Sequence, residues 1–317
     1  MPIKIPHNLP ASEILAKEGV QLIKDTDAVR QDIRPLRIAL LNLMPLKIKT
    51  ETQITRVLAG SPLQIEMTLI APTDYVPKNT PREHMLDFYH PFADIKAQKF
   101  DGLIVTGAPI EKLDFEQVEY WAELCKIFEW SARNVHSMFT LCWGAQAALQ
   151  HFYGIPKYLL PQKRFGVYSH RVLDHTPLLM HGLNDVFPVP VSRHTENHRE
   201  DFEKHTHLEI LVESEEAGLC LVRDNRLNHV HMFNHLEYDS NTLDGEYKRD
   251  TDKGENIPIP VNYYRDNDPE NEPVNTWRSN AHLLFGNWLN DIYQTTPYDI
   301  DLIGSTYGRE LVTEDSL

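Results

Sequence analysis

Ser137-Met138-Phe139-Thr140-Leu141-Cys142-Trp143-Gly144-Ala145-Gln146-Ala147-Ala148-Leu149 joins an apolar run to a run of small, helix-favouring residues, with Cys142 at the junction. This order predicts a strand, a sharp turn that carries a nucleophile, and a helix that leaves the turn. The unpaired N–H groups at the start of such a helix would favour a thiolate over a thiol. The alternative is a buried core cysteine that happens to end a strand.

The backbone that follows Cys142 could also stabilise an oxyanion. Trp143, Gly144 and Ala145 can offer N–H groups to a negatively charged oxygen that forms beside the sulfur. Gly144 removes a side chain where the turn is tight and a substrate would approach. The segment is therefore a candidate active site.

Apolar strands and helical stretches alternate before and up to this segment. Strands are expected at 36–43, 63–70, 101–107 and immediately before Cys142, with helices at 51–59 and 115–133. This alternation predicts an α/β fold with a mostly parallel sheet, right-handed crossovers and flanking helices. Ligands bind beyond the carboxyl ends of such strands, where Met44 to Lys47, Gly107 and Cys142 all fall.

The second half shows three more strand-like runs, a short helix, a loop rich in proline and asparagine, and a long last helix. The strand-like runs lie at 208–213, 219–223 and 227–233. The short helix is at 243–253, the loop at 257–273 and the long helix at 277–293. We expect an N-terminal arm at 1–35, a single α/β catalytic domain at 36–300, and a C-terminal tail at 301–317, frayed from 310 onwards.

Composition excludes several classes of function. The 317 residues are 41% hydrophobic and carry a net charge of −15, which argues against a general nucleic-acid binder or a protein held on an anionic membrane. An anionic ligand must then be met by a local cluster of Lys or Arg. Cys125, Cys142 and Cys220 have neither metal-site nor disulfide-framework spacing. We expect no metal and, since the start lacks the apolar stretch of a signal peptide, a cytoplasmic location.

A cysteine nucleophile needs a base, and His235 is placed to supply one. It follows the strand that ends at Phe233, and Glu237 lies two residues further on. A His-x-Glu at a strand end can place the imidazole over the sheet while the carboxylate holds one ring nitrogen. The alternative is a surface loop. His229 and His231 lie on the strand itself, where alternation would keep them within the sheet.

The order of a Cys turn and a distant His-x-Glu resembles the class I glutamine amidotransferase-like fold, which is flavodoxin-like. The resemblance narrows to the homoserine O-acyltransferase family of methionine biosynthesis and covers about residues 1–300. It is carried by Asn42-Leu43-Met44-Pro45, Asp101-Gly102-Leu103-Ile104-Val105-Thr106-Gly107-Ala108-Pro109, Cys142-Trp143-Gly144-Ala145-Gln146-Ala147, Tyr153-Gly154-Ile155-Pro156-Lys157 and Asn287-Trp288-Leu289-Asn290.

The resemblance implies a role for each matching residue. Cys142 would accept the acyl group, His235 would be the general base, and Glu237 would orient His235. Trp143 and Lys47 would lie at the oxyanion site. Substrate would be bound by Lys163, Ser192 and Arg249, and a buried Arg249 could grip the carboxylate of homoserine bidentately.

The resemblance also implies two half-reactions with acyl-CoA as co-substrate, no further cofactor, and a homodimer. In this family glutamate at the position of Glu111 accompanies acetyl-CoA, and glycine accompanies succinyl-CoA. A carboxylate there would repel the distal carboxylate of a succinyl group. We therefore expect a homoserine O-acetyltransferase, with the O-succinyltransferase as the alternative. A separate alternative is that Glu111 is an ordinary solvated loop residue after Pro109.

Some residues depart from the family pattern and put the shape of the substrate pocket in doubt. Asn234 and Leu236 replace Gly and Pro or Ser around the base, and Asn234 can replace Gly at a left-handed backbone position at modest cost. Val191 stands where the family commonly has His. Near the end of the chain, a family run that contains His-Gly-Asn is replaced by Trp277-Arg278-Ser279-Asn280-Ala281-His282. A glutamine amidotransferase would want Gly where Thr140 stands. A non-catalytic binding protein would be expected to have lost part of the Cys-His-Glu set.

Overall fold

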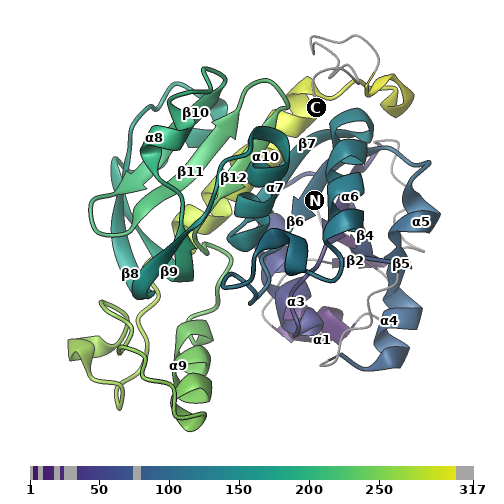
Figure 1. Cartoon of the computed structure of the whole chain (residues 1–317). Coiled ribbons are helices and arrows are strands. Elements are labelled where there is room, and N and C mark those ends of the chain that lie inside the picture. The colour runs from purple at the N-terminus through teal and green to yellow at the C-terminus, as the bar shows by residue number, and fades with distance from the viewer. Residues whose placement is uncertain (1–2, 6–9, 18–21, 25–33, 74–79, 305–317) are drawn as a thin grey trace.

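The computed structural model describes residues 3–5, 10–17, 22–24, 34–73 and 80–304. Within them lies one twelve-stranded sheet in the order β2-β1-β4-β3-β6-β7-β12-β11-β10-β8-β9, with β5 paired to β4 (Figure 1). The predicted frayed end falls outside the described residues. None of the helices in the described ranges is long and apolar enough to cross a membrane.

The strands around the predicted turn run parallel, as the sequence predicts. They are β4 (Ile65–Ala71), β3 (Leu36–Leu41), β6 (Phe100–Val105), β7 (Val135–Leu141) and β12 (His229–Met232), and each pairs in parallel with the next. Their carboxyl ends therefore meet at one edge, the edge where ligands bind in such sheets.

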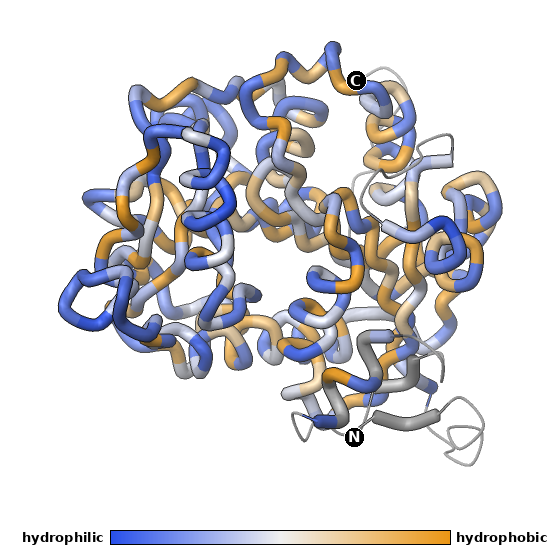
Figure 2. The backbone as a smooth tube through the Cα atoms, turned by 90° about the horizontal axis from the view of Figure 1, so that it is seen from below, coloured by the Kyte–Doolittle hydropathy of each residue, from blue (hydrophilic) through white to orange (hydrophobic). Residues whose placement is uncertain are grey.

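Helices cover both faces of this parallel part. On one face α3 (Lys47–Leu58) and α10 (Arg278–Thr295) pack on inward residues such as Ile38 and Leu40. On the other, α6 (Trp121–Asn134) and α7 (Trp143–Tyr153) pack on Ala39 and Leu41. Alternate residues of β3 thus serve two cores, which explains its nearly continuous apolar sequence. Hydrophobic residues gather inside and hydrophilic ones along outer loops (Figure 2).

An antiparallel part extends the sheet beyond β12. The predicted strands at 208–213 and 219–223 are β10 (Leu208–Ser214) and β11 (Gly218–Asp224). Two longer strands, β8 (Tyr158–Val172) and β9 (Val186–Glu196), were not expected from the sequence. They pair with each other and carry many polar residues, so they lack the continuous apolar run of the buried parallel strands.

Shorter elements complete the described chain. Before β3 lie β1 (Ile3–Ile5), α1 (Pro10–Lys17) and β2 (Leu22–Lys24), and β1 pairs with β4 at the sheet edge. The others are α4 (Arg82–Phe88), β5 (Tyr89–Pro91), α5 (Phe92–Ile95), α8 (Arg199–Phe202), α9 (Thr242–Asp252) and the 3-10 helices η1 (Phe115–Gln117), η2 (Leu178–Met180), η3 (Arg265–Asn267) and η4 (Ile300–Leu302). The division into arm, catalytic domain and tail remains a prediction.

Two buried histidines should make the fold sensitive to acid. Burial lowers the pKa of both His170 and His231 to about 4. Asn234 Nδ2 donates to His170 Nε2, and the buried Nε2 of His231 has no partner among the described residues. Because the unfolded chain binds these protons first, lowering the pH from 7 to 5 should reduce the free energy of unfolding by about 2 kcal/mol for each histidine.

Urea denaturation at the two pH values measures this difference. His231→Leu should reduce the difference in the free energy of unfolding between the two pH values by the contribution of one histidine. His175→Leu, which alters an exposed histidine, should leave this difference unchanged. An undiminished difference in His231→Leu would show that His231 does not contribute.

Candidate functional site

The predicted nucleophile turn is present at Cys142. This residue joins β7 to α7 with φ 49° and ψ −119°, a backbone conformation that non-glycine residues rarely adopt. Cys142 N donates to Met232 O at 2.7 Å, which ties the turn to β12. A Cβ at Gly144 would lie 2.6 Å from Thr106 O, so only glycine fits there. The surrounding structure thus holds the cysteine in a strained position at the carboxyl edge of the sheet.

His235 and Glu237 complete a hydrogen-bonded chain that starts at Cys142. The His235 side chain hydrogen-bonds to Cys142, and its Nδ1 lies 2.7 Å from Glu237 Oε1. His235 N donates to Pro190 O, which fixes the backbone. Burial of His235 opposes protonation, but the negative charges of Glu237 and Cys142 outweigh it and raise the His235 pKa well above its ordinary value. The arrangement can hold an imidazolium beside a sulfur.

Tyr238 links this chain to a second group of polar residues. Its ring stacks on the His235 ring with centroids 4.1 Å apart, and its hydroxyl donates to Glu246 Oε1 at 3.0 Å. Glu246 Oε2 also accepts from Ser192 Oγ at 2.5 Å and lies 3.3 Å from Lys163 Nζ. Glu246 therefore contacts two of the predicted substrate residues, Lys163 and Ser192, although no local pattern in the sequence singled it out.

Each of these residues comes from a different element. Lys163 lies on β8, Ser192 on β9 and Glu246 on α9, and the β8–β9 pairing sets Ser192 opposite Phe165. Lys163 Nζ also lies 3.3 Å from Asp250 Oδ2 and over the Phe165 ring. The unexpected strands β8 and β9 thus build one wall of the candidate site.

Arg249 differs from the expectation of a buried arginine. Its side chain is 52% exposed, and Nε donates to Asp250 Oδ1 at 2.6 Å. It lies near the end of the polar helix α9, where the side chain faces solvent. The Asp250 carboxylate pairs with both Arg249 and Lys163 and so connects the two cations.

Glu111 lies in the loop after β6, half-buried. Lys157 Nζ donates to the carbonyl oxygens of Glu111 and Leu113, both at 2.7 Å, and so holds this loop. Burial raises the pKa of Glu111, while its own backbone N–H and the charges of Lys163 and His235 oppose the rise. The Glu111 carboxyl group is therefore electrostatically coupled to the catalytic candidates and is not a solvated loop group.

Lys47 begins α3 and is almost fully buried. Its Nζ donates to Asn42 O. Burial lowers the pKa of Lys47 to about 8, with Glu51 partly offsetting the effect. Lys47 also lines a pocket that Glu237 borders.

Arg193 and Asn234 were missed or misread from the sequence. Arg193 is 3% exposed, donates to Leu219 O and Asn234 Oδ1, and interacts electrostatically with Cys142. Asn234 is not among the described residues with positive φ, so it does not use the left-handed backbone position that asparagine could have adopted in place of glycine. Its buried amide instead bridges Arg193 and His170, which explains a polar side chain in place of glycine.

One cluster in the described part has the composition of a metal site. Asp224, His229 and His231 are buried with ligand atoms within 4.8 Å of one another. The Asp224 carboxylate, however, already accepts hydrogen bonds from Tyr153 Oη and the N–H groups of Arg226 and Leu227. This network ties the β11–β12 turn to α7.

The chain is similar to one known family and to proteins of one known fold. A family model described as homoserine O-succinyltransferase matches residues 2–298. A homoserine O-acetyltransferase of Agrobacterium fabrum is 56% identical to this chain, and the match covers 96% of this chain and 99% of the relative. A homoserine O-acetyltransferase of Hyphomonas neptunium is 53% identical, and the match covers 96% of this chain and 100% of the relative. A solved glutamine amidotransferase of Thermotoga maritima shares the fold with 12% identity and a TM-score of 0.54, over 83% of this chain and 100% of its own.

Proposed function

The chain belongs to the homoserine O-succinyltransferase family and is an acyltransferase, and from that premise we propose that it transfers an acetyl group from acetyl-CoA to the γ-hydroxyl of L-homoserine. The hydrogen-bonded order Cys142–His235–Glu237 carries the proposal. Acetyl-CoA is the co-substrate, and no further cofactor is invoked. The product, O-acetyl-L-homoserine, would serve methionine biosynthesis.

The first half-reaction acylates the enzyme. The Cys142 thiolate attacks the thioester carbonyl carbon of acetyl-CoA, the bond from that carbon to the CoA sulfur breaks, and the departing sulfur takes the proton of the His235 imidazolium. The raised pKa of His235 supports this starting state, and buried Arg193 adds positive charge near the sulfur. Trp143 N–H, first in α7, and Lys47 are the proposed oxyanion donors.

The second half-reaction releases the ester. Neutral His235 takes the proton of the homoserine γ-hydroxyl, the oxygen attacks the acetyl-Cys142 carbonyl carbon, and the Cys142 thiolate leaves. Glu237 stabilises the imidazolium that forms again. Initial rates against both substrates should give parallel double-reciprocal lines, and intersecting lines would remove the support for the covalent route.

We assign the ammonium group of homoserine to Glu246 and its carboxylate to Lys163 and Arg249, with Ser192 orienting Glu246. Glu246→Gln removes the charge but keeps the shape, and should raise the KM for homoserine by about tenfold or more, because a charge-assisted hydrogen bond is lost. The KM for acetyl-CoA should change little. Asp252→Asn, on the exposed end of the same helix, is the matched control. Equal effects on both KM values would contradict this assignment.

Acetyl rather than succinyl transfer rests on Glu111 and on the names of the relatives. Glu111→Gly should raise kcat/KM for succinyl-CoA relative to acetyl-CoA by about tenfold or more, since it removes both a like charge and bulk from the acyl pocket. Glu111→Gln removes the charge alone and should give part of the gain. A succinyl preference in the unchanged protein would establish the alternative instead.

The homodimer and the cytoplasmic location remain predictions. Light scattering at assay concentration measures the first directly. A monomeric mass with full activity would show that the proposed chemistry needs one chain only.

A further inference from the structure

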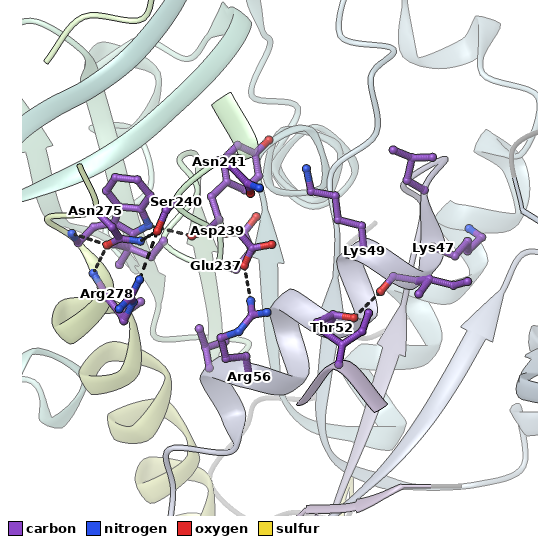
Figure 3. Close-up of a pocket in the computed structure, with 18 of the residues that line it drawn as sticks. Lys47, Lys49, Thr52, Arg56, Glu237, Asp239, Ser240, Asn241, Asn275 and Arg278 are labelled. Carbon is purple, nitrogen blue, oxygen red and sulfur yellow. Dashed lines mark hydrogen bonds and ion pairs between the residues drawn. The ribbon is translucent and has the colours of Figure 1, made fainter. Parts of the chain in front are cut away.

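A pocket of about 1050 Å³ lies where three helices begin (Figure 3). Its lining includes the residues that precede α3, α9 and α10, namely Leu46, Asn241 and Trp277. The start of a helix carries a partial positive charge and N–H groups without partners inside the helix. Three such ends at one pocket favour a negatively charged ligand.

Basic side chains outnumber acidic ones in the lining of the pocket. Two of the lining residues are acidic and four are basic: Glu237, Asp239, Lys47, Lys49, Arg56 and Arg278. The lining is thus formally positive in a chain whose net charge is −15. This is the local cationic cluster that an anionic ligand would need.

Two of the cations are available to a ligand. Arg56 pairs with Asp239 and Lys47 with a carbonyl oxygen, whereas the Lys49 ammonium has no hydrogen-bond or ion-pair partner among the described residues. Arg278 Nη2 donates to Ser240 Oγ at 3.2 Å, which leaves most of its guanidinium N–H groups for a ligand. In Figure 3 Lys49 extends from α3 and Arg278 from α10 toward the loop that carries Ser240.

The pocket borders the proposed catalytic site without including its nucleophile. Glu237 and Lys47 line the pocket, whereas Cys142, His235 and the residues assigned to homoserine (Lys163, Ser192 and Glu246) are not among its lining residues. Its volume is at the upper end of the range for small-molecule sites, far more than homoserine would fill. Its wall contains both apolar side chains and side chains with amide or hydroxyl groups, including Leu46, Val57, Leu236, Thr52, Asn241 and Asn275.

We propose that this pocket binds the phosphate-bearing part of the acyl-CoA donor, with Lys49 and Arg278 contacting its phosphate groups and the polar and apolar wall contacting the pantetheine arm. The inference rests on the proposed function only in taking a coenzyme A thioester as the donor.

Titration calorimetry with coenzyme A tests the pocket without requiring turnover. The double variant Lys49→Glu, Arg278→Glu should weaken coenzyme A binding by about a hundredfold, because each lost charge-assisted contact accounts for about tenfold. Lys126→Glu, an exposed charge reversal on α6, should bind coenzyme A like the unchanged protein. Circular dichroism of the three proteins checks that each is folded.

Kinetics then identify the phosphates as those of the donor. The double variant should raise the KM for acetyl-CoA but not for S-acetyl-N-acetylcysteamine, a thioester without phosphate, nor for homoserine. Unchanged coenzyme A affinity in the folded double variant, or an equal loss with both thioesters, would overturn the proposal. If the unchanged protein binds coenzyme A yet transfers no acetyl group from either thioester, the proposed function fails while the pocket assignment stands.

Discussion

Cys142→Ser is expected to lower kcat for acetyl transfer by at least about three orders of magnitude, because a hydroxyl is far less ionised and less nucleophilic than a thiol at neutral pH. The serine would occupy the same strained turn, with φ 49° in the native chain. A coenzyme A release assay with acetyl-CoA and homoserine measures the loss. Thermal unfolding should be nearly unaffected, since the change replaces one small side chain by another.

Cys125→Ser is the matched control for this loss. Cys125 lies half-buried on α6, and burial, with Glu129 and Glu116 nearby, raises its pKa to about 11, so it is poorly suited to nucleophilic attack. Its replacement should leave kcat within about twofold, as expected for a residue outside the transfer chemistry. If Cys142→Ser retained comparable activity, the covalent route through this sulfur would be wrong.

His235→Asn should lower kcat by about two to four orders of magnitude, the range usual for loss of a general acid–base group. The same residue serves both half-reactions, as acid toward the departing coenzyme A and as base toward homoserine. Asparagine keeps a polar side chain beside Glu237 but cannot exchange the proton. His175→Gln, at an exposed position, should have no such effect.

Alkylation of Cys142 by iodoacetamide distinguishes a loss of sulfur activation by His235 from a general disruption of the site. In the unchanged protein the imidazolium held by Glu237 should keep the sulfur reactive at neutral pH. His235→Asn should lower the alkylation rate at the same pH, because the positive charge beside the sulfur is lost. Equal alkylation rates in both proteins would show that His235 does not activate the sulfur.

The sequence predicted those parts of the site that depend on local order. The apolar run before Cys142, the small residues after it, and His235 two residues before Glu237 each lie on one element or turn. These patterns predicted the parallel sheet and the turn, which the structure confirms. The family resemblance added the expected roles of residues such as Glu111.

The rest of the site depends on contacts between distant elements. Glu246 contacts Ser192, which is 54 positions away in the sequence, and Lys163, which is 83 positions away. Ser192 and Lys163 lie on β9 and β8, whose polar, proline-containing sequences did not predict strands. Arg193 owes its burial to the backbone of the β10–β11 turn, which its side chain contacts. From the sequence, Asn234 could be interpreted only as a replacement for glycine, whereas in the structure its side-chain amide donates a hydrogen bond to His170.

The proposed mechanism requires an acetyl thioester on Cys142, so the most direct measurement is the mass of the protein after brief exposure to acetyl-CoA without homoserine. We predict a mass increase of one acetyl group, located on the Cys142 peptide, absent from Cys142→Ser and discharged when homoserine is added. An unmodified mass, together with coenzyme A release that occurs only when homoserine is present, would contradict the account.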